Sequence, residues 1–308
     1  MHFLHLKRNS GMKLISHYRR TLLLAAGLAL SGALFPASAA TSTLSARFAD
    51  LEHSANGRLG VTLIDTGNQQ AISYRGDERF AMASTFKVLL AGAVLQRSVA
   101  QPGLLEKRIR YDRTALQSYS PVTGKHLDDG MTIAELCAAA IEWSDNTAAN
   151  LLLTELGGPQ AVTQLARTLQ DDKTRLDRWE PELNTAIPGD ARDTSTPQAM
   201  AHNLQKLALG EALPPAQQQQ LIAWLKGSQT GAKTIRAGVP AGWDVGDKTG
   251  SGDYGTTNDL AIIWPPHGKP LVLAIYFTQQ KADAQARRDV LATATRWVLK
   301  ARENAASK

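Results

Sequence analysis

The chain has 308 residues, of which 43% are hydrophobic and 20% are charged, as in an ordinary globular protein. This length is enough for one large domain or for two lobes that share a core. The formal net charge of +6 belongs mostly to residues 1–39, which contain five basic residues and no acidic one, so the remainder carries only +1. We therefore expect no nucleic-acid partner, because the basic surface that such binding requires is missing.

The N-terminus predicts a secretory signal peptide, residues 1–39. Its basic beginning is followed by an apolar run, residues 21–35, which is too short for a comfortable membrane span. Ala37-Ser38-Ala39 offers small residues for cleavage, and Arg19-Arg20 also allows twin-arginine export. We expect a periplasmic protein, exported by the Sec or the twin-arginine route. No cysteine follows the apolar run as a site for a lipid, so no membrane anchor is expected.

The cysteine and histidine content argues against disulfides and metal sites. The single cysteine, Cys137, has no partner for an intramolecular disulfide and lies in an apolar run, residues 132–143. It is therefore expected to be a buried and unreactive thiol. The seven histidines show no spacing typical of metal ligands. We expect neither a metal nor another cofactor.

In chain order, the first elements of the mature protein are a helix and a hairpin. The helix covers residues 43–53, and the two strands cover residues 58–65 and 71–74. The pattern then becomes helical, with helices predicted from residue 84 and over residues 131–142, 147–156, 159–169, 197–209 and 214–227. Residues 112–130 form a polar linker. Residues 176–196 lack any period, and a run of that length in a compact domain is usually a functional loop.

The C-terminal part returns to strands, predicted over residues 242–249, 258–264 and 270–278, and ends with a helix over residues 282–302. Strands at both ends and helices between them predict an α/β (α+β) fold. Residues 40–80 and 228–308 would form an antiparallel sheet flanked by terminal helices. Residues 81–227 would form an all-helical lobe that contains the 176–196 active-site loop. A crevice between such lobes is a common ligand site.

Ser84 and Lys87 lie three residues apart at the start of a predicted buried helix. On one helix face, this spacing lets a hydroxyl and an amine share a proton. Backbone N–H groups at the helix start favour negative charge there, and a serine beside a base can accept an acyl group. Taken alone, however, Ser84 also fits a helix cap and Lys87 a solvated residue. Ser10 and Lys13 show the same spacing by chance.

Three further stretches give this pair a context. They are Ser144-Asp145-Asn146 between two predicted helices, Glu180-x-x-x-Asn184 in the long loop, and Lys248-Thr249-Gly250 at the end of a strand. Each stretch is a weak signal alone. Their occurrence together, in this order and each in a fitting structural context, is specific.

On these motifs, the chain from about residue 42 to 303 resembles the class A serine β-lactamases. Residues 84–90, 119–122, 178–184 and 190–194 are particularly similar, and residues 248–259 look most like the cefotaxime-hydrolysing branch. The resemblance implies the β-lactamase/D,D-peptidase-like fold. It also implies hydrolysis of penicillins and cephalosporins through a serine acyl-enzyme, which gives antibiotic resistance. The implied partners are β-lactam substrates and inhibitors, and the implied state is a monomer.

The resemblance assigns five catalytic residues. Ser84 would attack the lactam carbonyl, and Ser144 would pass a proton to the departing nitrogen. Glu180 would hold the water that hydrolyses the acyl-enzyme, and Lys248 would present a cation to the substrate carboxylate. Lys87 would be either a base with a lowered pKa or a charged group that lowers the local potential, and both alternatives stay open.

The resemblance also assigns seven substrate-binding residues: Tyr119, Asn146, Asn184, Thr249, Gly250, Ser251 and Arg288. Asn146 would bond the acyl-amide of the substrate, and the N–H groups of Ser84 and Ser251 would form the oxyanion hole. Many relatives carry an arginine where this chain has Thr257. Arg288 is the expected substitute, with a solvated helix arginine as the alternative.

Other residues of these motifs have expected structural roles. Asp145 would cap the helix that follows it. Arg178 and Asp193 would form an ion pair that closes the loop bearing Glu180. The Glu180–Pro181 peptide bond is expected to be cis, as in relatives.

Two rival functions share part of this pattern. A penicillin-binding D,D-peptidase would have the same acylating serine but would deacylate slowly, and a periplasmic β-lactam sensor domain would keep the acyl group. Glu180 and Asn184 favour a hydrolase over both, because they offer a place for a deacylating water.

Overall fold

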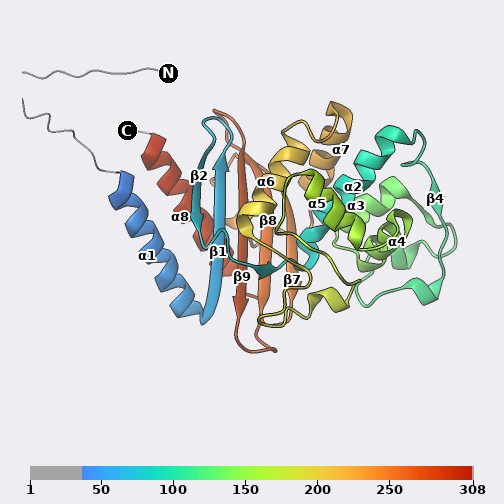
Figure 1. The fold of residues 1–308 in the computed structure, drawn as a ribbon, viewed down its shortest axis with the longest axis horizontal. Coiled ribbons are helices and arrows are strands. Elements are labelled where there is room, and N and C mark those ends of the chain that lie inside the picture. Colours follow the sequence, from blue (N-terminus) through green and yellow to red (C-terminus); the bar gives the residue numbers. More distant parts are fainter. Residues whose placement is uncertain (1–36, 307–308) are drawn as a thin grey trace, which may run out of the picture. The chain divides into compact units, whose positions relative to one another are not determined.

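A computed structural model describes residues 37–306 of the chain (Figure 1). The basic segment and the apolar run of the predicted signal peptide lie outside the described residues. Within residues 37–306, no helix has the length and apolar character needed to cross a membrane. The same residues contain no group of three potential metal-ligating side chains.

A five-stranded antiparallel sheet joins the two ends of the chain, in the strand order β2-β1-β9-β8-β7 (Figure 1). Its strands are β1 (Gly57–Asp65), β2 (Gln70–Tyr74), β7 (Asp244–Gly252), β8 (Thr256–Trp264) and β9 (Leu271–Gln279). The pairing of β1 with β9 places Leu63 opposite Leu273. The predicted sheet from both chain ends is therefore confirmed.

The two faces of the sheet contribute to different apolar clusters, because successive side chains of a strand point to opposite faces. On β9, Leu273, Ile275 and Phe277 belong to the cluster that also contains residues of α1 (Ala37–Ala55) and α8 (Arg288–Ala306). The intervening residues, Ala274 and Tyr276, belong to the cluster formed with the central helices. Terminal helices therefore cover one face, and the helical part of the chain covers the other.

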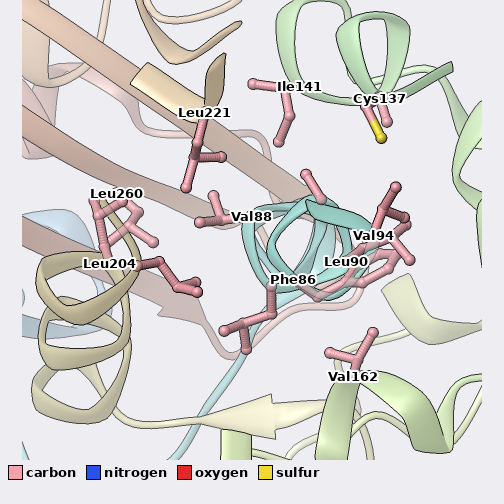
Figure 2. Packing of buried hydrophobic residues seen from close by; sticks show 14 of the residues in the cluster. Phe86, Val88, Leu90, Val94, Cys137, Ile141, Val162, Leu204, Leu221 and Leu260 are labelled. Atoms are coloured by element: carbon pink, nitrogen blue, oxygen red, sulfur yellow. The ribbon is translucent and has the colours of Figure 1, made fainter. Parts of the chain in front are cut away.

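The helices between the strands surround α2 (Lys87–Ala100), which is buried on most sides. The others are α3 (Ile133–Glu142), α4 (Asn146–Leu156), α5 (Gln160–Thr168), α6 (Pro197–Ala208) and α7 (Pro215–Lys226). Figure 2 shows the α2 side chains pointing in several directions, with Ile141, Leu204 and Val162 on different sides of the helix. A helix that is apolar on most sides is expected in a core. Its first residue, Lys87, is therefore held in a rigid and dry environment.

The predicted start of the last helix, at residue 282, was wrong by six residues, because α8 begins at Arg288. Two long-range bonds hold the preceding segment to other elements, although it also contains a turn closed by a 3.1 Å bond from Ala284 N to Lys281 O. The Ala282 carbonyl accepts from Tyr254 N at 3.0 Å, and Arg287 N donates to Thr257 Oγ1 at 3.0 Å. These long-range bonds hold the segment outside the helix.

Short elements were also missed by the sequence pattern. β3 (Phe80–Ala81) pairs with β6 (Thr194–Ser195), and β4 (Arg108–Ile109) pairs with β5 (Met131–Thr132). The predicted structureless run 176–196 therefore contains a strand, and it also contains a single helical turn, Glu182–Asn184. Elements of two or three residues show no period, so their pairing depends on the tertiary fold.

Several local predictions are confirmed. Thr132 and Glu135 form the predicted capping box at α3, and Asp145 caps α4 by accepting from Ala148 N at 2.9 Å. Cys137 is buried, and burial raises the pKa of its thiol. The limits of the two predicted lobes stay a prediction.

Candidate active site

Ser84 lies in a single 3₁₀ turn, Ala83–Phe86, that leads directly into α2. Neither this turn nor α2 has a side-chain hydrogen bond at its N-cap, so Ser84 is not a helix cap. Strand β7 passes very close to the turn. A Cβ atom on Gly250 would lie 2.8 Å from the Met82 carbonyl oxygen and 3.2 Å from Ser84 N. Only glycine allows this approach, which brings the Lys248-Thr249-Gly250 stretch next to Ser84.

The Lys87 ammonium is the centre of a polar cluster within the apolar core. It is fully buried, and its Nζ lies 3.0 Å from Ser84 Oγ and 2.9 Å from Glu180 Oε1. It also donates to Asn146 Oδ1 at 2.7 Å and to the Ser144 carbonyl at 2.9 Å. Residues from three of the four motifs therefore meet at one side chain, and Lys87 is not a solvated residue.

Burial lowers the pKa of Lys87 from its ordinary value, because the ammonium loses its hydration. The negative charge of Glu180 opposes this change. Ser84 Oγ also lies 3.4 Å from Glu180 Oε1, as a hydrogen-bond donor to the carboxylate. The hydroxyl of Ser84 is thus in contact with an amine and a carboxylate, the arrangement that activates a serine nucleophile.

Glu180 is held in place by two asparagines. Asn184 Nδ2 donates to the Glu180 carboxylate. Asn150 bonds the Glu180 backbone twice, since its Oδ1 accepts from Glu180 N at 3.0 Å and its Nδ2 donates to Glu180 O at 2.8 Å. Asn150 was not among the residues predicted from the sequence. Its position one helical turn after Asn146, on a helix with many apolar residues, is the signal that could have identified it.

The loop that bears Glu180 is closed by the predicted ion pair. Arg178 Nε lies 2.6 Å from Asp193 Oδ2, and Asp193 Oδ1 accepts from the backbone N–H groups of Asp177 and Arg178. The Asp193 side chain is only 1% exposed, whereas that of Arg178 is 19% exposed. The Glu180–Pro181 bond is cis, as expected.

Ser144 and Lys248 are in direct contact at one side of the site. Lys248 Nζ donates to Ser144 Oγ at 2.9 Å and to the Thr249 carbonyl at 2.7 Å. Burial, and then the charge of Lys87, lower the pKa of Lys248 to about 7. Ser144 has a φ of +60°, in the tight connection between α3 and α4. Because Lys248 Nζ contacts the Ser144 hydroxyl and has a lowered pKa, these two groups can exchange a proton.

These side chains border a cavity of about 330 Å³. Its lining comprises Ser84, Tyr119, Ser144, Asn146, Asn184, Thr230, Thr234, Thr249, Gly250, Ser251, Thr257, Asn258 and Arg288. All seven residues that were expected to bind substrate are among them. Lys87, Glu180 and Lys248 do not line the cavity but lie behind Ser84 and Ser144, where they are at most 2% exposed.

Thr230 is a lining residue for which the sequence offered no signal. Its hydroxyl lies 2.6 Å from Thr249 Oγ1, although it belongs to a loop without a motif. Arg288 lies at the first position of α8 and is exposed toward the cavity. The Thr257 hydroxyl, which accepts from Arg287 N, fixes the start of that helix beside the site.

Residues 43–301 match the Beta-lactamase enzyme family. The chain is 53% identical to Beta-lactamase OXY-1 of Klebsiella oxytoca, over 92% of this chain and 98% of that protein. It is 56% identical to Beta-lactamase Toho-1 of Escherichia coli, over 80% of this chain and 85% of that protein. The solved structure of an ancestral (GNCA) class A β-lactamase is similar with a TM-score of 0.81 and 57% identity, over 84% of this chain and 99% of that chain.

Proposed function

Since the chain belongs to the class A β-lactamases, which hydrolyse β-lactam rings, we propose that its reaction passes through an acyl-enzyme formed on Ser84. The comparisons favour neither of the two rival functions, the D,D-peptidase and the sensor domain. One observation carries the assignment of residues. The Ser84 hydroxyl, the Lys87 amine and the Glu180 carboxylate lie within 3.4 Å of one another in a buried cluster.

Acylation begins with attack of Ser84 Oγ on the lactam carbonyl. The hydroxyl proton passes to Lys87 Nζ, 3.0 Å away, because burial lowers the pKa of this lysine and makes its neutral amine accessible. Glu180 stays ionised and is free to act in the deacylation step. The carbonyl oxygen becomes negative and accepts hydrogen bonds from the backbone N–H groups of Ser84 and Ser251. Aligned donors of this kind contribute roughly 3–4 kcal/mol each to transition-state stabilisation.

Opening of the ring requires a proton on the departing nitrogen. Ser144 supplies this proton, since its hydroxyl lines the cavity and lies 2.9 Å from Lys248 Nζ, which replaces it. The proton that Lys87 took from Ser84 restores the Lys248 ammonium, so acylation consumes no net proton. Thr249 and Ser251 bind the substrate carboxylate at the cavity, the buried Lys248 cation behind Ser144 attracts it electrostatically, and Asn146 bonds the acyl-amide. Tyr119, which is 49% exposed at the cavity, stacks on the substrate.

Deacylation uses a water held by Glu180 and Asn184. Asn184 Nδ2 bonds the Glu180 carboxylate, and Asn184 Oδ1 is buried without a hydrogen-bond partner among the described residues. This oxygen is available to accept a bond from the attacking water. Glu180 takes the proton of that water, a step for which a positioned carboxylate typically contributes about 10²–10⁴-fold. As the acyl bond to Ser84 breaks, the same proton passes from Glu180 to Ser84 Oγ, 3.4 Å away, and both groups return to their starting state.

The substrate range extends to oxyimino-cephalosporins. Ser251 and Arg288 line the cavity, and residues 248–259 resemble the cefotaxime-hydrolysing branch. We expect comparable kcat/KM values for cefotaxime and benzylpenicillin, measured on the mature protein. A cefotaxime value lower by a factor of a thousand would restrict the enzyme to penicillins.

The proposal also includes the cell compartment and the oligomeric state of the enzyme. The mature enzyme is a periplasmic monomer, as the predicted signal peptide and the resemblance to exported class A enzymes suggest. Cell fractionation and light scattering of the purified protein test these two points.

The decisive test is the Glu180→Ala variant. Without the carboxylate, acylation leaves a product that water does not remove, so we expect a persistent mass adduct on Ser84 after incubation with benzylpenicillin. Glu182→Ala is the matched control, because Glu182 is an exposed carboxylate of the same loop. It should hydrolyse the substrate at the native rate.

Two results would contradict the proposal. Native turnover by the Glu180→Ala variant would remove Glu180 from deacylation. A single equivalent of product from the native protein, followed by a stall, would favour the peptidase or the sensor.

A further inference from the structure

A second hollow lies on another part of the loop that bears Glu180. Its volume is about 610 Å³, and it shares no lining residue with the active-site cavity. Loop residues 186–192 form one wall, and residues at or beside the ends of β1, β3 and β9 form the other. The size falls within the range of about 300–1,000 Å³ that is usual for small-molecule sites.

The walls of the hollow carry four arginines, and three of them have carboxylate partners. These pairs are Arg58–Glu78 at 3.0 Å, Arg178–Asp193 at 2.6 Å and Arg192–Asp190 at 2.7 Å. The Arg192 guanidinium holds the pKa of Asp190 at about 2, so this carboxylate is already charged and paired. Each of these three pairs is neutral overall, so together they add little net charge to the walls of the hollow.

Arg79 is different from these three. Its Nη1 donates to two neutral oxygens, the Lys173 carbonyl at 2.6 Å and Thr194 Oγ1 at 3.0 Å. Within residues 37–306, no carboxylate forms an ion pair with it. The two bonds orient the guanidinium at the wall of the hollow, and its charge remains without a counter-ion. A planar guanidinium in this state is suited to a carboxylate ligand.

The loop wall, residues 186–192, carries an apolar turn. Ile187 is 46% exposed, and it begins the turn Ile187-Pro188-Gly189-Asp190, which is closed by a 3.0 Å bond from Asp190 N to Ile187 O. Gly189 has a φ of +83°, and proline at the second position with glycine at the third is typical of a type II turn. The exposed Ile187 side chain on this hydrogen-bonded turn can contact the apolar part of a ligand.

We propose that this hollow is a second ligand site, which binds a small organic anion with a carboxylate on an apolar body. The carboxylate pairs with Arg79, and the apolar body contacts Ile187 and Pro188. Such a ligand contacts both the loop and the ends of the sheet strands. Because it binds the native arrangement of these segments, its binding stabilises the folded protein.

Benzoate is the probe for this site, used with the mature enzyme. Ser84 is first blocked with a boronic acid inhibitor, because the active-site cavity also offers groups that bind carboxylates. We expect saturable binding in the millimolar range by NMR chemical-shift titration, with shifts at residues 186–192, together with a rise in Tm. Absence of saturable binding at this segment would overturn the proposal.

Two pairs of variants locate the binding. Arg79→Gln should weaken benzoate binding about tenfold or more, and Arg79→Lys should weaken it less, since a charged hydrogen bond is partly kept. Ile187→Glu should abolish binding by repulsion, whereas the neutral Ile187→Gln should keep most of it. Tm values without ligand show whether each variant is folded. Unchanged affinity in both Arg79→Gln and Ile187→Glu would place the ligand elsewhere and would also overturn the proposal.

Discussion

The two halves of the active site are held in different ways. Ser84 and Lys87 lie at the start of a helix that is buried among apolar side chains, and β7 packs directly against their turn. Glu180 lies in a loop, held by two asparagines and by one ion pair. Acylation therefore depends on secondary structure and the core, whereas deacylation depends on a few polar contacts. Substitutions should separate the two steps accordingly.

The largest effect is expected from Ser84→Ala, on the helix side. Both steps need the same oxygen atom, so turnover of nitrocefin should fall by about 10⁴-fold or more. No covalent adduct should be detectable by mass spectrometry. A thermal unfolding curve shows, independently of activity, whether the variant is folded. An adduct formed by this variant would show that another residue is the nucleophile.

A smaller effect is expected from Arg178→Ala, on the loop side. The buried Asp193 would lose its charged partner, which costs about 3 kcal/mol in the free energy of unfolding. Displacement of Glu180 by about 1 Å would slow deacylation by roughly 10²-fold. Burst kinetics should therefore show a normal acylation phase followed by slow turnover.

The control for this variant is Arg175→Ala. Arg175 forms an ion pair with Asp177 and is 44% exposed, so its loss should change stability by less than about 1 kcal/mol. If Arg178→Ala slowed acylation as much as deacylation, the separation of the two halves would be wrong.

Asn150→Ala tests the contact between the two halves, because Asn150 lies on a helix and bonds the loop. Loss of two bonds to the Glu180 backbone should slow deacylation about tenfold. Asn150→Asp keeps the acceptor for Glu180 N and should retain more activity. Equal rates for the two variants would mean that the bond to Glu180 N contributes nothing.

The smallest effect concerns pH. The pKa of Lys248 is lowered to about 7, so its ammonium is present below that pH and is lost as the pH rises through it. The KM for benzylpenicillin should then rise about three- to fivefold between pH 6 and 9, since the buried cation that attracts the substrate carboxylate is lost. Lys248→Arg keeps its charge and should show a flat profile. A flat profile in the native enzyme would contradict this assignment.

The sequence predicted those parts of the fold that depend on neighbouring residues. Apolar periods predicted β1, β9 and α3, and the Thr132–Glu135 spacing predicted the helix start. The start of α8 could not be predicted in this way. It depends on bonds from Arg287 N to Thr257 and from Tyr254 N to Ala282, which join segments far apart in the chain.

The same distinction holds within the site. Residues in motifs, such as Ser84 and Glu180, could be predicted because their spacing carries the signal. Thr230 could not, since it acts through one partner that is distant in sequence, and Asn150 carried only the weak signal of lying one helical turn after Asn146. Their importance appears only when the loop and the strands are placed against the helices.

The buried thiol of Cys137 has one more consequence. As the only cysteine of the chain, it leaves the fold without a covalent crosslink. Folding of the chain therefore requires no disulfide formation. We expect the free energy of unfolding to be the same at a reducing and at an oxidising redox potential. The enzyme is thus independent of the disulfide-forming machinery of the cell that makes it.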